Sequence, residues 1–185
     1  EPYRMFTSRA EYRILLRQDN ADLRLTEKGY RIGLATKKRY DFFVQKKSLS
    51  ESLKNFLTTT STQPCEIENY LKSVDSAQIS QSRKLSYLLA RNEITLEGLI
   101  ENIPVLKNFI DNNNISKEII EEVEIQIKYK GYIEREKLIA EKLRRLENIR
   151  INEDFDYYSL QSLTMEARQK LTKIKPSTIG QASRI

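Results

Sequence analysis

The sequence contains no histidine and no tryptophan, and 185 residues include one cysteine, five glycines and four prolines. Without histidine, the chain alone cannot form a histidine-based zinc site, a Ser-His-Asp triad or a Cys-His pair. The single cysteine, Cys65, excludes an internal disulfide and fits a cytoplasmic location. No apolar run reaches 18 residues and no signal-peptide pattern opens the chain, so we expect no membrane association. We expect no catalytic and no metal-binding residues in this chain.

The scarcity of glycine and proline disfavours an all-β fold, because such folds need many tight turns. Neither G-x-G-x-x-G nor G-x-x-x-x-G-K-[ST] occurs, so the sequence predicts neither a dinucleotide-binding fold nor a P-loop. Apolar residues make up 39% of the chain and charged residues 31%, which suits helices with one buried stripe and one solvated face. We predict an all-α, mainly helical fold: a helical bundle with one long helix and a small C-terminal helical subdomain.

Capping residues and breaks indicate where the first helices begin and end. Thr26 is the expected N-cap of a short helix that ends near Gly33, and Thr36 is the expected N-cap of a long helix with apolar residues for burial. The segment 58–64, a run of hydroxylated residues ending in proline, should break the chain. The segment 11–18 fits a helix and a strand equally well.

Beyond this break, we expect further helices at 65–74, 80–91, 95–103, 117–149 and 164–174, with a turn at 111–114, a linker at 150–158, and a last helix that opens at Ser177 after Pro176. The predicted domains are a basic helical region at 1–115, the long helix at 116–150, and a truncated C-terminal helical subdomain at 151–185.

The positive charge is concentrated at the start of the chain. Residues 1–47 contain 12 Lys and Arg against 6 Asp and Glu, whereas the other 138 residues contain 20 of each. Arginines can fork onto phosphate oxygens, and neighbouring tyrosines could stack on unpaired bases. A solvated helical face with ion pairs, such as Glu27 with Arg31, is the other interpretation, and charge alone favours it because helices with arginines are common. The candidate RNA-binding residues, several at helical spacing, are Arg9, Arg13, Arg17, Arg24 and Arg31.

The predicted helix at 117–149 has an apolar residue every seventh position, as in a heptad seam. An antiparallel helix of the same chain could fill this seam, or a partner protein could fill part of it. Gly131 lies in mid-helix, where glycine costs about 1 kcal/mol relative to alanine, so a close approach of another chain, or of a neighbouring helix, could explain it. The candidate partner-binding residues are Gly131, Tyr132, Ile133 and Arg135, together with residues 165–185.

Three stretches carry a resemblance to a known family. EPYRMFTSRAEYRILLRQDNADLRLTEKG at 1–29, EVEIQIKYKGYIEREKLIAEKLRRLENIRINEDFDY at 122–157 and EARQKLTKIKPSTIGQASRI at 166–185 resemble the C-terminal region of the GidA/MnmG family, in the same order. The middle, 35–115, carries no such signature. Two departures stand out: the family pattern reads GYIERQ where this chain has Glu136, and the family continues beyond IGQASRI.

The resemblance implies a tRNA-modifying flavoenzyme. Members bind FAD, use NADH and work with the GTPase MnmE to add a carboxymethylaminomethyl or aminomethyl group to the wobble uridine of tRNA. The resemblance also implies that the parent enzyme is a homodimer. The FAD fingerprint and catalytic cysteines of the family precede this region, so Cys65 inherits no role and this chain should bind no FAD. The C-terminal region is the part implicated in contacts with tRNA and MnmE.

Two other interpretations stay open. The chain could be a free-standing helical protein–protein adaptor with no RNA role. It could also be a complete enzyme with Asp19, Asp22 or Glu11 as a general base, although carboxylates among arginines are usually ion-paired and ionised.

Overall fold

The computed structural model describes residues 12–185, and they confirm the predicted all-α fold. Within this range lie ten α-helices, one short 3-10 helix and a single antiparallel pair of two-residue strands. The chain forms two compact units, residues 16–132 and residues 133–185 with 12–15. None of the helices in the described part of the chain is both long and apolar enough to cross a membrane.

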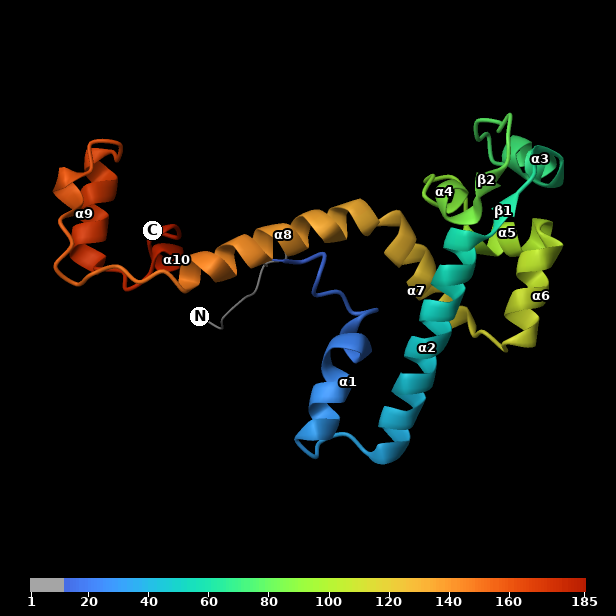
Figure 1. The fold of residues 1–185 in the computed structure, drawn as a ribbon, viewed down its shortest axis with the longest axis horizontal. Helices are drawn as coiled ribbons and strands as arrows, with labels where there is room; N and C mark the ends of the chain where they lie inside the picture. Colours follow the sequence, from blue (N-terminus) through green and yellow to red (C-terminus); the bar gives the residue numbers. More distant parts are fainter. Residues whose placement is uncertain (1–11) are drawn as a thin grey trace, which may run out of the picture. The chain divides into compact units, whose positions relative to one another are not determined.

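The first unit begins with a helical hairpin. Helices α1 (Ala21–Arg31) and α2 (Lys37–Thr59) lie side by side and run in opposite directions (Figure 1). Gly33 ends α1 as predicted, with a φ of 78° that favours glycine. The Thr36 hydroxyl accepts a hydrogen bond from the Arg39 backbone N–H and caps α2, also as predicted. The prediction for Thr26 is wrong: α1 begins five residues earlier, and Thr26 is buried within it.

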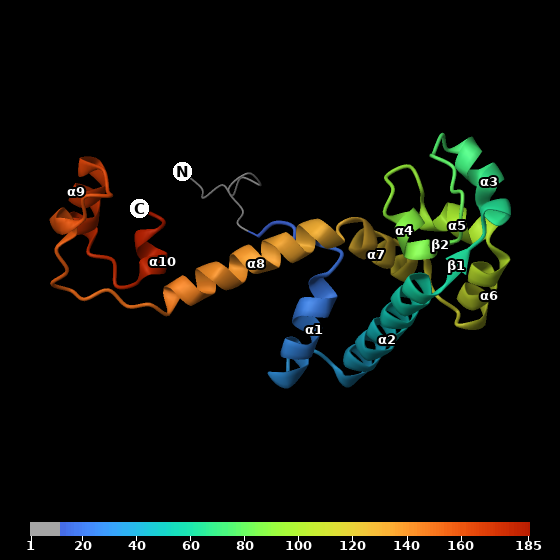
Figure 2. The ribbon, with the colours of Figure 1, turned by 45° about the horizontal axis from the view of Figure 1, so that its top comes forward.

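The core of this unit forms where several short helices gather around the C-terminal half of α2 (Figure 2). The predicted break holds strand β1 (Ser61–Thr62), which pairs with β2 (Arg83–Lys84). Leucines at helical spacing meet in the centre, and each is fully buried, for example Leu53, Leu88 and Leu99. The helices around α2 are α3 (Pro64–Ser73), α4 (Leu85–Leu89), α5 (Leu96–Asn102), α6 (Pro104–Asn112) and α7 (Lys117–Lys128).

The helix predicted at 117–149 is two helices, α7 and α8 (Lys130–Glu147), interrupted at Tyr129. Gly131 follows directly, and glycine is among the weakest helix formers, so the interruption falls where helix propensity is lowest. A Cβ added at Gly131 would have no atom within 4 Å among the described residues. A neighbouring helix of this part of the chain therefore does not explain the glycine.

The second unit contains most of α8, the 3-10 helix η2 (Tyr157–Ser159), α9 (Met165–Ile174) and α10 (Ile179–Ala182). Thr164 caps α9 as predicted, because its hydroxyl accepts a hydrogen bond from the Ala167 backbone N–H. The predicted linker at 150–158 packs against the rest of this unit. The Ile151 N–H donates to the Ser177 carbonyl over 2.9 Å, and Tyr157 is buried. Thr178, not Ser177, caps the last helix.

Candidate functional site

The candidate RNA-binding arginines lie in different environments in the structure. Arg9 lies outside the described residues, and Arg13 is exposed. Residues 12–15 form a turn, with a positive φ at Tyr12, and residues 16 and 17 are not helical, so the helical spacing considered for Arg13 and Arg17 is wrong. The Arg17 guanidinium binds both oxygens of Asp19, with Nε–Oδ1 and Nη2–Oδ2 distances of 3.0 Å. Asp19 is therefore an ion-pair partner rather than a free base.

The other two candidate arginines lie on α1. Arg24 is half-buried and donates from Nε to the Asn20 side chain over 2.9 Å. Arg31 is 74% exposed and forms the expected i,i+4 ion pair with Glu27. Both interpretations of the charge, solvated ion pairs and phosphate binding, therefore apply to Arg31.

The connection between α1 and α2 gathers exposed cations. We call Lys28, Arg31, Lys37 and Lys38 the hairpin tip, and all four side chains are exposed. The first turn of α2 holds no acidic residue, although the partial positive charge of a helix N-terminus favours anions there and opposes cations. These lysines are thus not placed for helix stability. They add to a positive potential that attracts phosphate.

The tyrosines near this tip are engaged with each other. The rings of Tyr30 and Tyr40 stack with centroids 4.3 Å apart and planes 11° apart. They brace the hairpin, which leaves the charged side chains of the tip as its main groups for a ligand.

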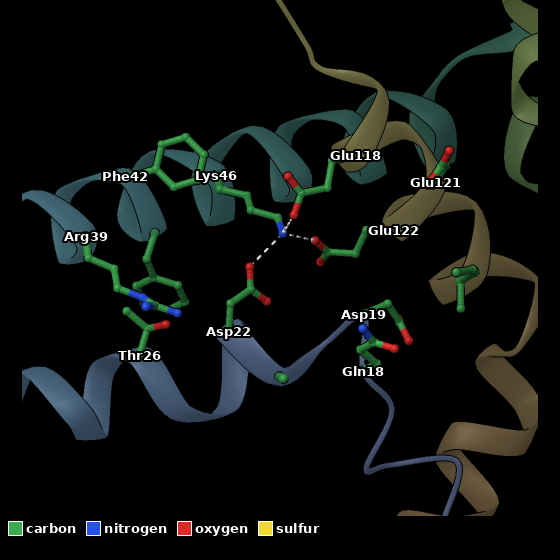
Figure 3. Close-up of a pocket in the computed structure, with 13 residues that line it drawn as sticks. Gln18, Asp19, Asp22, Thr26, Arg39, Phe42, Lys46, Glu118, Glu121 and Glu122 are labelled. Carbon is green, nitrogen blue, oxygen red and sulfur yellow. Dashed lines mark hydrogen bonds and ion pairs between the residues drawn. The ribbon is translucent and has the colours of Figure 1, made fainter. Parts of the chain in front are cut away.

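A buried lysine forms a second cluster in a hollow between α1, α2 and α7 (Figure 3). The Lys46 ammonium lies 2.6 Å from a carboxylate oxygen of Asp22 and 2.6 Å from one of Glu118, and 3.5 Å from Glu122 Oε2. Only 4% of the Lys46 side chain and 2% of the Glu122 side chain are exposed. Glu122 Oε1 also accepts a hydrogen bond from the Gln126 amide over 2.8 Å.

This environment shifts both pKa values upward. Burial alone would lower the pKa of Lys46, but its hydrogen bonds to Asp22 and Glu118 outweigh burial and raise it, so the ammonium stays charged. Burial raises the pKa of the Glu122 carboxyl, and the nearby ammonium offsets this only in part.

The Lys46 cluster holds three helices together, and its carboxylates are committed to the ammonium. Asp22, one of the candidate general bases, is ion-paired here, and Glu11 lies outside the described residues. Within residues 12–185, no group of three or more acidic or cysteine side chains is arranged to hold a metal ion. Sequence reasoning missed this cluster, although Lys46 lies on the buried stripe of α2 with Phe43 and Leu53.

The candidate partner-binding residues lie at the start of α8. Tyr132 is 59% exposed, Arg135 is exposed and Ile133 is half-buried. No described residue of α8 is buried, and the seam residue Ile139 is 45% exposed. Exposed apolar side chains also occur in the C-terminal segment, such as Met165 at 58%. The heptad seam is therefore left largely unfilled by its own unit.

Comparison with known proteins gives consistent matches. Residues 37–137 match the family model for the "tRNA modifying enzyme MnmG/GidA C-terminal helical domain", and residues 139–185 match that for its "C-terminal helical bundle". The chain is 54% identical to the tRNA uridine 5-carboxymethylaminomethyl modification enzyme MnmG of Parabacteroides distasonis, and 50% identical to that of Bacteroides thetaiotaomicron. Each alignment covers 100% of this chain and 30% of the relative, so the chain spans about a third of their length.

A solved structure agrees with the sequence relatives. GidA of Aquifex aeolicus, in its form II crystal, is 38% identical with a TM-score of 0.63, and the match covers 100% of this chain and 28% of that one. The two family-model matches together cover most of the chain. They include the middle region, in which no signature was recognisable from the sequence. The chain therefore belongs to the MnmG/GidA family of tRNA-modifying enzymes and corresponds to its C-terminal helical region.

Proposed function

We propose that this chain is the tRNA-holding and partner-docking portion of an MnmG-type enzyme. The observation that carries the tRNA role is the hairpin tip, where four exposed cations cluster and two of them, Lys37 and Lys38, lie at a helix N-terminus that disfavours cations. Phosphate contacts from such side chains hold a nucleic acid without reading its sequence. The names of the relatives supply the substrate class, a tRNA in which a uridine is to be modified.

The parent enzyme, in this proposal, is a cytoplasmic, homodimeric flavoenzyme. It uses FAD and NADH and acts with the GTPase MnmE to add a carboxymethylaminomethyl group to the wobble uridine of tRNA. The described residues do not fit a dinucleotide, because their one sheet has two-residue strands and no glycine-rich turn leads from a strand into a helix. We therefore assign cofactor binding and chemistry to the part of the parent outside this chain.

The tRNA role makes a prediction about salt. The logarithm of the association constant of the 185-residue chain for unmodified tRNA should fall linearly with the logarithm of salt concentration, with a slope of about −0.7 to −0.9 for each phosphate contacted. Fluorescence anisotropy with labelled tRNA between roughly 50 and 200 mM salt measures this slope. A free-standing adaptor without an RNA role would show no saturable binding at the low-salt end.

For partner docking, we propose that MnmE meets the start of α8 at Tyr132, Ile133 and Arg135, together with residues 165–185. Tyrosine and arginine combine large contact area with polar tips and are the types that most often anchor interfaces. The open space beside Gly131 leaves room for another chain to approach the helix backbone closely.

The double variant Tyr132→Ala, Arg135→Ala should bind MnmE about thirtyfold more weakly or worse, because each of the two anchors is expected to contribute about 1 kcal/mol or more. Calorimetric titration with purified MnmE measures the affinity. Glu141→Ala is the control, since this side chain is exposed and lies on the opposite side of the helix from Tyr132. Equal affinities of the double variant and the control would contradict the assignment.

A further inference from the structure

A second basic surface lies at the other end of α2 from the hairpin tip. It is a hollow formed by the C-terminal part of α2, the β1–β2 pair, α4, and the residues where α7 gives way to α8. Five cations line it, and none of the described residues that line it is acidic. We call it the basic hollow; its charged and aromatic lining residues are Lys54, Arg83, Lys84, Lys128, Lys130 and Tyr87.

Neutral groups hold two of the cations of the hollow, Lys54 and Lys84. Lys54 donates to the Gln126 side-chain oxygen over 3.4 Å, and Lys84 donates to the backbone carbonyl of Thr58 over 2.8 Å. Lys128 forms an ion pair with Glu124 over 2.8 Å. Neutral partners fix the side chains in place without cancelling their charge, so the hollow keeps a positive potential.

The hollow also presents an aromatic surface. The Arg83 guanidinium carbon lies 5.3 Å from the centre of the Tyr87 ring, a cation–π arrangement, and Tyr87 is 55% exposed. Ser61 and Ser82 also line the hollow, and their hydroxyl groups can donate hydrogen bonds to a ligand. Cations, hydroxyls and an exposed ring together match the phosphates and bases of an unpaired RNA segment.

The separation of the two basic surfaces favours a large ligand. From Lys37 to Lys54 the α2 backbone rises by about 26 Å, at roughly 1.5 Å per residue. A single phosphate ion or nucleotide could occupy one surface only. An RNA chain is long enough to contact both, and a row of phosphates satisfies cations at each end.

We propose that the basic hollow is a second RNA-backbone site, which binds a single-stranded segment of the same tRNA with phosphates on Lys54, Arg83 and Lys130 and a base on Tyr87. This inference rests on the proposed tRNA role of the chain. It adds a contact region about one helix length from the hairpin tip, formed by three segments that are distant in the sequence.

The test compares two triple variants of the 185-residue chain in tRNA binding. Lys54→Gln, Arg83→Gln, Lys130→Gln removes three charges from the hollow, and Lys72→Gln, Lys107→Gln, Lys117→Gln removes three from exposed positions elsewhere in the same unit. The hollow variant should bind tRNA about tenfold more weakly than the control, with a salt slope about 2 to 3 smaller in magnitude. Tyr87→Ala should also weaken binding about tenfold but leave the salt slope unchanged, because stacking releases no counterions.

Four outcomes decide the inference. The expected losses, with an unaffected control and unchanged circular dichroism spectra, support it. Equal tRNA affinities of both triple variants, with wild-type binding intact, overturn it and leave the proposed function standing. Competition of tRNA by inorganic phosphate or ADP at low millimolar concentration marks a small-anion site and overturns it. Absence of tRNA binding by the wild type, with saturable binding of poly-glutamate, overturns both this inference and the proposed function.

Discussion

Replacing Lys46 with methionine should destabilise the chain by about 3–5 kcal/mol, because the substitution leaves the carboxylate of Glu122 buried without its compensating charge. Glu122 is only 3% exposed, and the ammonium is 3.5 Å from its Oε2 atom. Urea unfolding at pH 7, followed by circular dichroism, measures the loss. Lys47→Met provides the control, since this neighbouring side chain is exposed and its change should stay within about 0.5 kcal/mol.

The loss of unfolding free energy caused by Lys46→Met should become smaller as the pH falls from 7 to 5. Burial already raises the pKa of Glu122 in the wild type, and removing the ammonium that lowers it should raise this pKa further. A carboxyl whose folded pKa exceeds its unfolded pKa stabilises the fold when protonated, and this contribution is lost as the pH rises through the folded pKa. Acid therefore neutralises Glu122 in the variant and relieves the unpaired charge.

A second substitution separates this explanation from a packing defect. In the Lys46→Met background, Glu122→Gln should restore a large part of the lost stability, because the amide carries no charge to bury. A defect caused by the shape of methionine would persist in the double variant. Equal urea midpoints for Lys46→Met and Lys47→Met would refute the account of the cluster.

Local chemistry allowed much of the fold to be predicted from the sequence. Thr36 and Thr164 were recognisable as N-caps because a hydroxyl before an apolar periodic segment can accept a bond from a free backbone N–H. Gly33 was recognisable as a helix stop, since its positive φ suits glycine. The prediction for Thr26 failed because the same local pattern also occurs inside a helix. Thr26 precedes an apolar periodic segment as a cap would, but it is a buried residue within α1.

The features that depend on distant segments could not be predicted. Lys46 is buried because Glu118 and Glu122, more than seventy residues later, lie beside α2 in the folded chain. The basic hollow likewise combines residues from α2, β2, α4 and the start of α8, and no single stretch of sequence is strongly basic there. The apolar periodicity of 117–149 was visible, but the interruption at Tyr129 was not.

The tRNA role depends most directly on the hairpin tip. The triple variant Arg31→Gln, Lys37→Gln, Lys38→Gln removes three of its four exposed cations, two of them at the N-terminus of α2. It should weaken tRNA binding by about tenfold or more, with a salt slope smaller in magnitude by about 2 to 3. Stability should change by no more than about 0.5 kcal/mol, because relief of the two lysines at the α2 N-terminus offsets loss of the exposed Arg31–Glu27 ion pair. Loss of binding without loss of stability distinguishes a ligand contact from a structural one.

The most direct measurement of this role is the tRNA dissociation constant of that variant at low and moderate salt, beside the wild type and the Lys72→Gln, Lys107→Gln, Lys117→Gln control. Both triple variants lower the formal net charge of +6 by the same amount, so a general charge effect cancels in the comparison. A fully folded tip variant that binds tRNA about tenfold more weakly than the control is the expected result. Identical affinities and salt slopes for the tip variant and the control would contradict the assignment of the α1–α2 hairpin as a tRNA-holding element.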